Sequence, residues 1–404
     1  MTRKLRLSSA LLTLGFALAA CGGSDAATPS APAVDVTKLD SGNYPTTAVD
    51  LEPSRVPTSG ALREAIRIGA ATPIASQFDP RFIFATGFSG GRHITAVDPP
   101  YFSGSGIEST DFNTVVPGVV AGWDSSANRR DQLYAGREVS TITLRFSTPD
   151  QAKFAATELS NRTPSSAYQI PSYPDSLAKL EVKTDPLRLQ HLRAWLVRGD
   201  MLLSIDVTDP IGLPYDPAAD AEVVRKYFDK QLELLRTYTP TPLNEIDKLP
   251  LDTEGLLGHV LPTEAAKRPK KGTSSSAAYP LQAVLHLEEH PAIMVPAYTD
   301  AGVDLVAFDT GSVYRTRDEA AAGRFRAALD NETTSDTDYM KVDGPPNLPV
   351  VHCFNAKPEV KYASDAPPTC HGVIGRYVFG VSGTNLQDVY QRAAAQYKLL
   401  VGFS

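Results

Sequence analysis

Apolar and polar positions follow the same order twice along this chain. In the first half, VSTITLRF (139–146) alternates with the two-residue period of a strand, and STPDQAKFAATELS then has the spacing of an amphipathic helix. In the second half, GSVYRTRDEAAAGRFRAAL (311–329) repeats this order. We expect Thr148 and Thr316 to cap the two helices, each followed by an aspartate in the first turn, where the helix dipole favours negative charge.

The remainder of each half repeats as well. RAWLVRGDMLLSIDV (193–207), a strand pair with a Gly-Asp turn, resembles VIGRYVFGVSG (373–383), and QLELL (231–235) in one terminal helix aligns with QYKLL (396–400) in the other. The sequence therefore predicts an α+β fold of two similar β-α-β-β-α units, each a mainly antiparallel sheet with helices packed on one face. Two unrelated α+β domains are the alternative, because the identities are short.

The segment 54–135 is additional to the first unit, and there we expect a helix at 59–70 and a short strand at 81–86. The whole pattern predicts these parts: a lipoprotein signal peptide at 1–20, a flexible tether at 21–37, an N-terminal α+β domain at 38–240, a Pro/Lys/Ser-rich connection at 241–280 and a C-terminal α+β domain at 281–404.

The N-terminus has the features of an export signal. Three basic residues precede an apolar run that is too short to cross a bilayer core comfortably. Leu18-Ala19-Ala20-Cys21 then matches the bacterial lipobox, in which the thiol is diacylated and becomes the new N-terminus. Because two acyl chains give a stable anchor, we expect a diacylglyceryl anchor at Cys21 on the extracytoplasmic face of the cell membrane. An ordinary cleaved signal, with Cys21 incidental, is the alternative.

Charge argues against a nucleic-acid partner. The formal net charge is −7, and nucleic-acid affinity depends on neutralising phosphates with cations. KRPKKG (267–272) is the one basic cluster that the pattern singles out, and its Pro, Gly and Ser neighbours favour a solvated linker.

Two cysteines, Cys353 and Cys370, remain after the anchor cysteine. Outside the cytoplasm such a pair normally forms a structural disulfide, which at this spacing contributes on the order of 3 kcal/mol. We expect the bridge to join two strands across a Pro-rich loop. His352 and His371 flank the pair and are predicted strand residues, with a pH-sensitive or metal-binding surface as the alternative.

Two motifs resemble catalytic sites. Ser89 lies in G-x-S-x-G after an apolar strand, but two prolines and no helical pattern follow, which favours a Gly-rich turn or ligand-facing loop over a nucleophile. His286, Glu289 and His290 satisfy H-x-x-E-H, a zinc-peptidase pattern, but Pro291 follows at once, which favours a polar helix end.

No cofactor or metal is predicted, and the leading hypothesis is a non-enzymatic protein. It would bind a small or lipidic ligand, or an envelope protein, in the cleft between its two units. Trp123 and Trp195 could line such a cleft, although core packing is favoured for both. The alternatives are an envelope hydrolase, of the serine type at Ser89 or the metal type at His286 and His290, and a structural role with a filled contact between the units.

The lipobox, DVTKLDSGNYPTTAVDL (35–51), AGVDLVAFDTGSVYRTRDEA (301–320) and the C-terminal CHGVIGRYVFGVSG resemble an actinobacterial, mycobacterial or nocardial type of envelope lipoprotein family. The resemblance implies an N-terminal and a C-terminal family domain, no assigned activity and one functional position, the lipidated Cys21. A weaker similarity is to the extracytoplasmic sensor domains of actinobacterial membrane kinases, which are disulfide-braced α+β modules.

Overall fold

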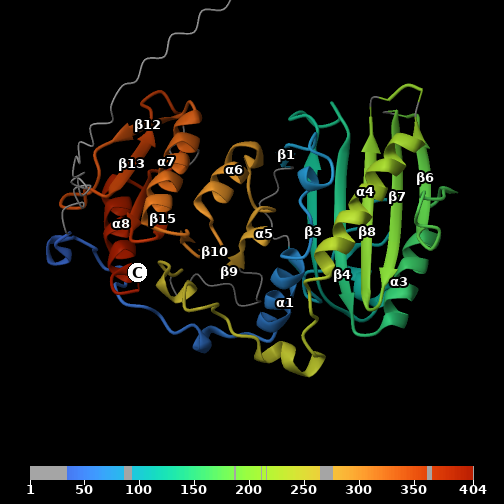
Figure 1. Cartoon of the computed structure of the whole chain (residues 1–404), viewed down its shortest axis with the longest axis horizontal. Coiled ribbons are helices and arrows are strands. Elements are labelled where there is room, and N and C mark those ends of the chain that lie inside the picture. The colour runs from blue at the N-terminus through green and yellow to red at the C-terminus, as the bar shows by residue number, and fades with distance from the viewer. Residues whose placement is uncertain are drawn as a thin grey trace, which may run out of the picture. The chain divides into compact units, whose positions relative to one another are not determined.

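Two antiparallel sheets, of eight and seven strands, organise the part of the chain that the structure describes (Figure 1). The structure is a computed structural model and describes residues 34–85, 93–185, 188–210, 212–214, 216–263, 276–361 and 366–403. Asp35–Ser404 is a compact unit with its own core, distinct from Met1–Val34. The predicted α+β class is confirmed.

The N-terminal sheet has the strand order β1-β3-β4-β8-β7-β6-β5, and β2 pairs with β3 beside this path. Its strands are β1 (Phe84–Ala85), β2 (His93–Ile94), β3 (Val119–Asn128), β4 (Glu138–Phe146), β5 (Ser166–Ala167), β6 (Leu177–Lys183), β7 (Leu189–Arg198) and β8 (Met201–Asp209).

The C-terminal sheet has the order β12-β13-β14-β15-β11-β10-β9. Its strands are β9 (Ala277–Pro280), β10 (Leu305–Phe308), β11 (Gly311–Arg315), β12 (Tyr339–Val342), β13 (Val351–Ala356), β14 (Thr369–Ile374) and β15 (Tyr377–Ser382).

Helices connect and cover these strands. The α-helices are α1 (Ser59–Gly69), α2 (Phe112–Val115), α3 (Pro149–Arg162), α4 (Pro217–Leu235), α5 (Leu281–Val284), α6 (Pro291–Ala301), α7 (Glu319–Ser335) and α8 (Leu386–Leu400). Short 3₁₀ turns are η1 (Val36–Lys38), η2 (Glu52–Ser54), η3 (Ala75–Gln77), η4 (Ser109–Asp111), η5 (Leu243–Lys248) and η6 (Leu257–His259). No helix among the described residues is long and apolar enough to span a bilayer.

The strand orders of the two sheets correspond element by element, which is consistent with two similar units. β3-β4-β8-β7-β6-β5 in one sheet matches β10-β11-β15-β14-β13-β12 in the other. In both, a helix follows the second strand of the series (α3 after β4, α7 after β11) and another follows the third (α4 after β8, α8 after β15). The predicted strand pairs and terminal helices therefore occupy equivalent places.

The prediction of helices on one face of each sheet does not hold for the N-terminal sheet. Successive residues of a strand point to opposite faces. On β8, Leu202 belongs to the buried cluster that contains Ala155 and Leu159 of α3, whereas Leu203 belongs to the cluster that contains Val224 of α4. The two helices therefore cover opposite faces, and the sheet is buried on both.

The helix caps correct the expected register of the repeat. Thr148 caps α3 and accepts a hydrogen bond from the amide of Gln151. In the second half, Asp318 is the cap of α7 and accepts from the amide of Ala321, so Thr316 was wrongly assigned this role. The equivalent of Thr148 is thus two residues later than the sequence comparison placed it, because Asp is a stronger N-terminal cap than Thr.

A buried glutamine confirms the alignment of QLELL with QYKLL. Gln231 on α4 donates from Nε2 to the carbonyl of Ala71 at 2.6 Å. Gln396 on α8 donates from Nε2 to the carbonyl of His259 at 2.7 Å. Both side chains are fully buried, and each satisfies a backbone group of a loop that lies against the helix, as buried polar groups require.

The two halves share one continuous apolar core. A single cluster of buried side chains includes Leu203 and Trp123 of the N-terminal sheet together with Tyr279, Met294 and Phe325 of the C-terminal half. α1 packs against both β3 and β9. The junction is therefore built like a protein interior.

The chain begins its described course on the C-terminal half. Lys398 of α8 donates to the carbonyl of Leu39 at 2.9 Å, and Gln391 donates to Asp40 at 3.0 Å. The amide of Val49 then bonds to the carbonyl of Gly258 at 2.9 Å. Residues 35–49 thus contact the C-terminal helix before α1 joins the N-terminal sheet.

Candidate functional site

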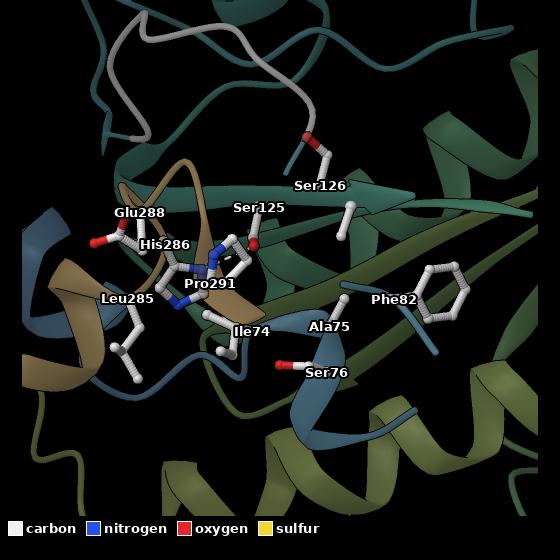
Figure 2. A pocket seen from close by; sticks show the side chains of 11 residues that line it. Ile74, Ala75, Ser76, Phe82, Ser125, Ser126, Leu285, His286, Glu288 and Pro291 are labelled. Carbon is white, nitrogen blue, oxygen red and sulfur yellow. Dashed lines mark hydrogen bonds between the residues drawn. The ribbon is translucent and has the colours of Figure 1, made fainter. Parts of the chain in front are cut away.

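His286 lies buried where the two halves meet (Figure 2). Its Nδ1 is 2.8 Å from Ser125 Oγ on β3, and its Nε2 is 3.0 Å from the carbonyl oxygen of Thr72. The carbonyl can only accept, so Nε2 carries the proton and Nδ1 accepts from the serine. Both ring nitrogens are therefore engaged in tying the C-terminal half to β3.

The H-x-x-E-H motif is not helical. α5 ends at Val284, and α6 begins at Pro291 with His290 as its N-terminal cap. His290 is exposed and 3.0 Å from Glu332, and Glu289 is exposed as well. The motif thus joins a buried histidine and an exposed one across a helix break, and no group of three His, Cys, Asp or Glu in the described ranges is placed to hold a metal ion.

Two predicted residues, Cys21 and Ser89, lie outside the described residues, as does the basic stretch at 267–272. The lipid anchor at Cys21 therefore stays a prediction, as does the Gly-rich turn or loop that was favoured over a nucleophile at Ser89. The tryptophans behave as expected of core residues, since Trp123 and Trp195 are both buried.

A small cavity lies at the described part of the junction. The cavity beside His286 and Ser125 has a volume of about 20 Å³, which suits a single water. Nearby, Tyr279 of β9 and His93 of β2 are joined at 2.9 Å between the hydroxyl and Nε2. Burial lowers the pKa of His93 to about 4, with Arg63 contributing repulsion. At this cavity the described residues leave no space for an organic ligand, and the ligand-binding cleft between the units stays a prediction.

A larger groove, with a volume of about 570 Å³, lies at one end of the N-terminal sheet. Three segments form it: the residues before β1, the β3–β4 hairpin and the residues after β8. Its lining is rich in arginine and consists of Pro80, Arg81, Ile83, Arg129, Arg130, Gly136, Arg137, Asp209 and Gly212. The volume falls within the range of about 300–1,000 Å³ typical of small-molecule sites.

A buried carboxylate holds two of these arginines. Asp79 accepts from Arg81 Nε at 2.9 Å and from Arg129 Nη2 at 2.6 Å. Burial alone would raise the pKa of Asp79, but the hydrogen bonds from both arginines outweigh it and keep this pKa well below its usual range. Arg129 also lies over the ring of Phe82, 4.7 Å from its centroid. Its guanidinium is therefore fixed on one side by charge and on another by an aromatic face.

A second carboxylate pair orients Arg137. Its Nη2 is 2.8 Å from Asp209 and its Nε is 2.7 Å from Asp220. Burial, with repulsion from Asp209, raises the pKa of Asp220 to about 6, although Gln190 and Arg137 oppose the shift. Arg137 is thus held by two buried carboxylates, those of Asp209 and Asp220.

Arg130 differs from the other three arginines. It is exposed, and the described residues provide no hydrogen-bond or ion-pair partner for its guanidinium. Gly136 makes room for it, since a Cβ there would lie 2.8 Å from Arg130 Cγ. The groove therefore contains one free cation beside three fixed ones, an arrangement that can accept an anion.

The arginine groove is not apparent in the sequence because its residues are spread from 80 to 212. One signal was available: Arg129, Arg130 and Arg137 lie close together in NRRDQLYAGRE (128–138). This hairpin is a second basic cluster, which corrects the statement that 267–272 is the one such run. Its charge is masked in sequence by Asp131 and Glu138, and Glu138 accepts a hydrogen bond from the amide of Tyr134.

In the C-terminal half, the expected disulfide is present between Cys353 and Cys370, whose Cα atoms are 4.1 Å apart. The flanking histidines are strand residues, as predicted, and face each other on β13 and β14. Both donate to one carboxylate: His352 Nδ1 is 2.7 Å, and His371 Nδ1 3.0 Å, from Asp330 of α7. With both Nδ1 atoms directed at Asp330, the group is a hydrogen-bonded cluster beneath the helix.

Residues 51–251 match the model of a family described as domain of unknown function DUF7373, N-terminal, and residues 256–402 match the model of its C-terminal domain. No curated protein matches significantly. Among solved structures, the extracellular domain of PknH from Mycobacterium tuberculosis matches with a TM-score of 0.31 and 14% identity, covering 42% of this chain and 96% of that chain.

Proposed function

The chain belongs to the DUF7373 family, whose function is unknown. We propose that it is a lipid-anchored extracytoplasmic protein that binds an anionic ligand, without transforming it, in the arginine groove. The observation that carries this proposal is the convergence of four arginines on one groove of about 570 Å³ in a chain whose net charge is negative.

The chemistry of the lining supports an anion. Three arginines are anchored by Asp79, Asp209 and Asp220, which limits the conformational entropy that these long side chains lose when a ligand arrives. Each guanidinium has five N–H donors in a planar fork, so the ion pairs leave donors over. Charge-assisted hydrogen bonds from such donors are among the stronger polar contacts in proteins.

The lipobox at residues 18–21 supports the anchor and the location. A diacylated Cys21 would confine the binding body to a lipid surface, where confinement raises the effective concentration of ligands and partners that share the surface. Replacing Cys21 with Ala should release the protein from the membrane fraction, and a mutant protein that stays in the membrane pellet would contradict the anchor.

Binding is tested with the body that spans residues 35–404 and glycerol 3-phosphate as a simple phosphate monoester. Isothermal titration calorimetry should detect saturable binding that weakens at least about tenfold in Arg130→Gln, because a charge-assisted hydrogen bond contributes about 1.5–3 kcal/mol. Arg236→Gln, which removes an exposed arginine on the C-terminal end of α4, is the matched control and should bind normally. Absence of binding to the unaltered protein would overturn the anion site.

A further inference from the structure

We propose that the ligand of the arginine groove is an amphiphile, with a phosphate headgroup held by the arginines and an alkyl portion held against apolar side chains at the rim. This inference rests on the proposed anion site and names the chemical class of its ligand. The geometry that points to it is the juxtaposition of charged and exposed apolar residues on the same three segments.

Exposed apolar side chains border the groove on each of its segments. Ile83, which lines it, is 40% exposed. Leu133 and Tyr134 lie at the tip of the β3–β4 hairpin, between the lining residues Arg130 and Gly136, and are 60% and 45% exposed. Leu213 follows the lining residue Gly212 directly and is 66% exposed. Four of the large exposed apolar residues of the described chain are therefore gathered around this groove.

Isolated exposed apolar residues are ordinary, but a group of them beside a charged groove is informative. The hairpin connects β3 and β4, which lie side by side in the sheet (Figure 1). The backbone at the tip of this hairpin has a defined conformation. Tyr134 has a positive φ of 60°, and its amide donates a hydrogen bond to the carboxylate of Glu138. The fold therefore keeps Leu133 and Tyr134 exposed to solvent, and it does so at the cost of a left-handed backbone conformation that a non-glycine residue rarely adopts.

The headgroup is best matched by a phosphate. A phosphate monoester carries close to two negative charges and three acceptor oxygens at neutral pH, so it can accept from Arg81 and from the arginines of the hairpin together. A single carboxylate has two oxygens and pairs best with one guanidinium. The free cation, Arg130, would supply the last contact, and the alkyl portion would lie towards Ile83 and Leu133.

Three probes separate head from chain in titration calorimetry of the 35–404 body, all used below their micelle concentrations. They are dihexanoyl phosphatidic acid, glycerol 3-phosphate and dihexanoyl phosphatidylcholine. We expect the phosphatidic acid to bind at least about tenfold more tightly than glycerol 3-phosphate, because burial of two methylene groups suffices for that factor. The phosphatidylcholine, whose charge is balanced, should bind weakly.

Paired variants assign the two parts of the ligand. Ile83→Ser with Leu133→Ser should reduce the affinity for phosphatidic acid to that for glycerol 3-phosphate and leave the latter unchanged. Met340→Ser, at a position that is 42% exposed on β12 of the C-terminal sheet, is the apolar control. Arg130→Gln should weaken both anionic probes by similar factors.

The outcomes distinguish this inference from the proposed function. Equal affinity for glycerol 3-phosphate and phosphatidic acid would leave the anion site standing and overturn the amphiphile. Equal affinity for phosphatidylcholine and phosphatidic acid would overturn the headgroup assignment. No binding of any probe would overturn both proposals.

Discussion

Cys353 and Cys370 face each other on β13 and β14, whereas in the N-terminal half Ala178 and Ala194 face each other at the matching positions of β6 and β7. Cys370 precedes the β15 residue Tyr377 by seven positions, as Ala194 precedes the β8 residue Met201. The same place in two equivalent sheets thus carries a covalent bridge in one and a pair of small apolar residues in the other.

The faces of the two sheets that lie against α3 and α7 also differ, because the one in the C-terminal half is more polar. Trp195 of β7 packs in an apolar cluster with Leu159 of α3, while its counterpart His371 bonds to Asp330 of α7. The N-terminal half therefore rests on apolar packing beneath α3, whereas the C-terminal half replaces part of that packing with polar contacts. We infer that the cystine compensates for the smaller apolar contribution, since a crosslink stabilises a fold by restricting the unfolded chain.

The largest effect should come from what the halves share, the buried glutamines. Gln231→Leu removes the donor to the Ala71 carbonyl and the acceptor of the Thr143 hydroxyl, which keeps only a long contact from Thr72. Gln396→Leu removes the donor to the His259 carbonyl and the acceptor of the Leu261 amide. Each orphaned buried group costs about 1–3 kcal/mol, so we expect each variant to lose about 4 kcal/mol of unfolding free energy in urea titrations.

Gln387→Leu, at an exposed position of α8, is the control and should be nearly neutral. The cost of leaving one buried polar group without a partner itself varies by about 2 kcal/mol. A larger difference between the two variants in lost unfolding free energy would show that the halves are not equivalent at the buried glutamines.

A pH effect should arise where the halves meet. His93 is buried and its pKa is lowered to about 4, so the folded protein keeps it neutral while the unfolded chain takes up a proton below about pH 6.5. Stability is therefore complete above pH 6.5 and declines as the pH falls towards 4, by about 3 kcal/mol from this residue.

Urea titrations at pH 7, 5.5 and 4.5 measure this decline. His93→Gln should flatten it, even if the variant is less stable at pH 7, because glutamine does not titrate in this range. Gln387→Leu, at an exposed position of α8, should leave the decline as it is in the unaltered protein. A slope that His93→Gln does not change would assign the acid sensitivity to other groups.

The cystine sharpens the comparison directly. Cys353→Ala with Cys370→Ala gives the C-terminal half the residues that the N-terminal half has at these positions. We expect the unfolding free energy to fall by about 3 kcal/mol, because the unfolded chain without the crosslink has more conformational entropy. Reduction of the unaltered protein by dithiothreitol should give the same loss, and a double variant as stable as the unaltered protein would show that the cystine does not compensate for the polar face.

Much of this fold was predictable because its signals are local. The helices at 59–69, 149–162 and 217–235 follow from apolar spacing, and the β7–β8 hairpin follows from its Gly-Asp turn, where Gly199 has a positive φ of 59°. β3 was missed, since VVAGWDSSAN mixes polar and apolar residues on a strand that is covered on both faces. The sequence also could not show which face of the sheet each helix covers. The spacing of apolar residues indicates which side of a helix is buried, but not which face of the sheet packs against it.

The arginine groove shows where such prediction ends. Its parts come from three segments that are brought together by sheet pairing, and Asp79, which orients two arginines, is remote in sequence from Arg129. The motifs that were visible, such as H-x-x-E-H, were local and did not form a site. A constellation of this kind becomes visible only when the strand order is known.

Transferring the bridge to the other half should have a moderate effect. Ala178→Cys with Ala194→Cys places two thiols directly across β6 and β7. We expect the oxidised variant to be about 2 kcal/mol more stable than its own reduced form, less than the ideal loop-closure value because two sulfurs must fit into a filled core. Ala178→Cys alone measures that packing cost, and failure to oxidise would show that the two sheets differ in local strand geometry.

The smallest effects test the register of the repeat at the helix caps. Thr148→Ala and Asp318→Ala should each cost about 1 kcal/mol, as loss of an N-terminal cap does. Stability alone cannot separate Asp318 from Thr316, because the Thr316 hydroxyl has a bond of its own, 2.8 Å to the carbonyl of Arg376. Amide hydrogen exchange can: Asp318→Ala should speed exchange at Ala321, and Thr148→Ala should do so at Gln151. Thr316→Val should leave Ala321 protected, whereas faster exchange there would restore the register in which the two threonines are equivalent.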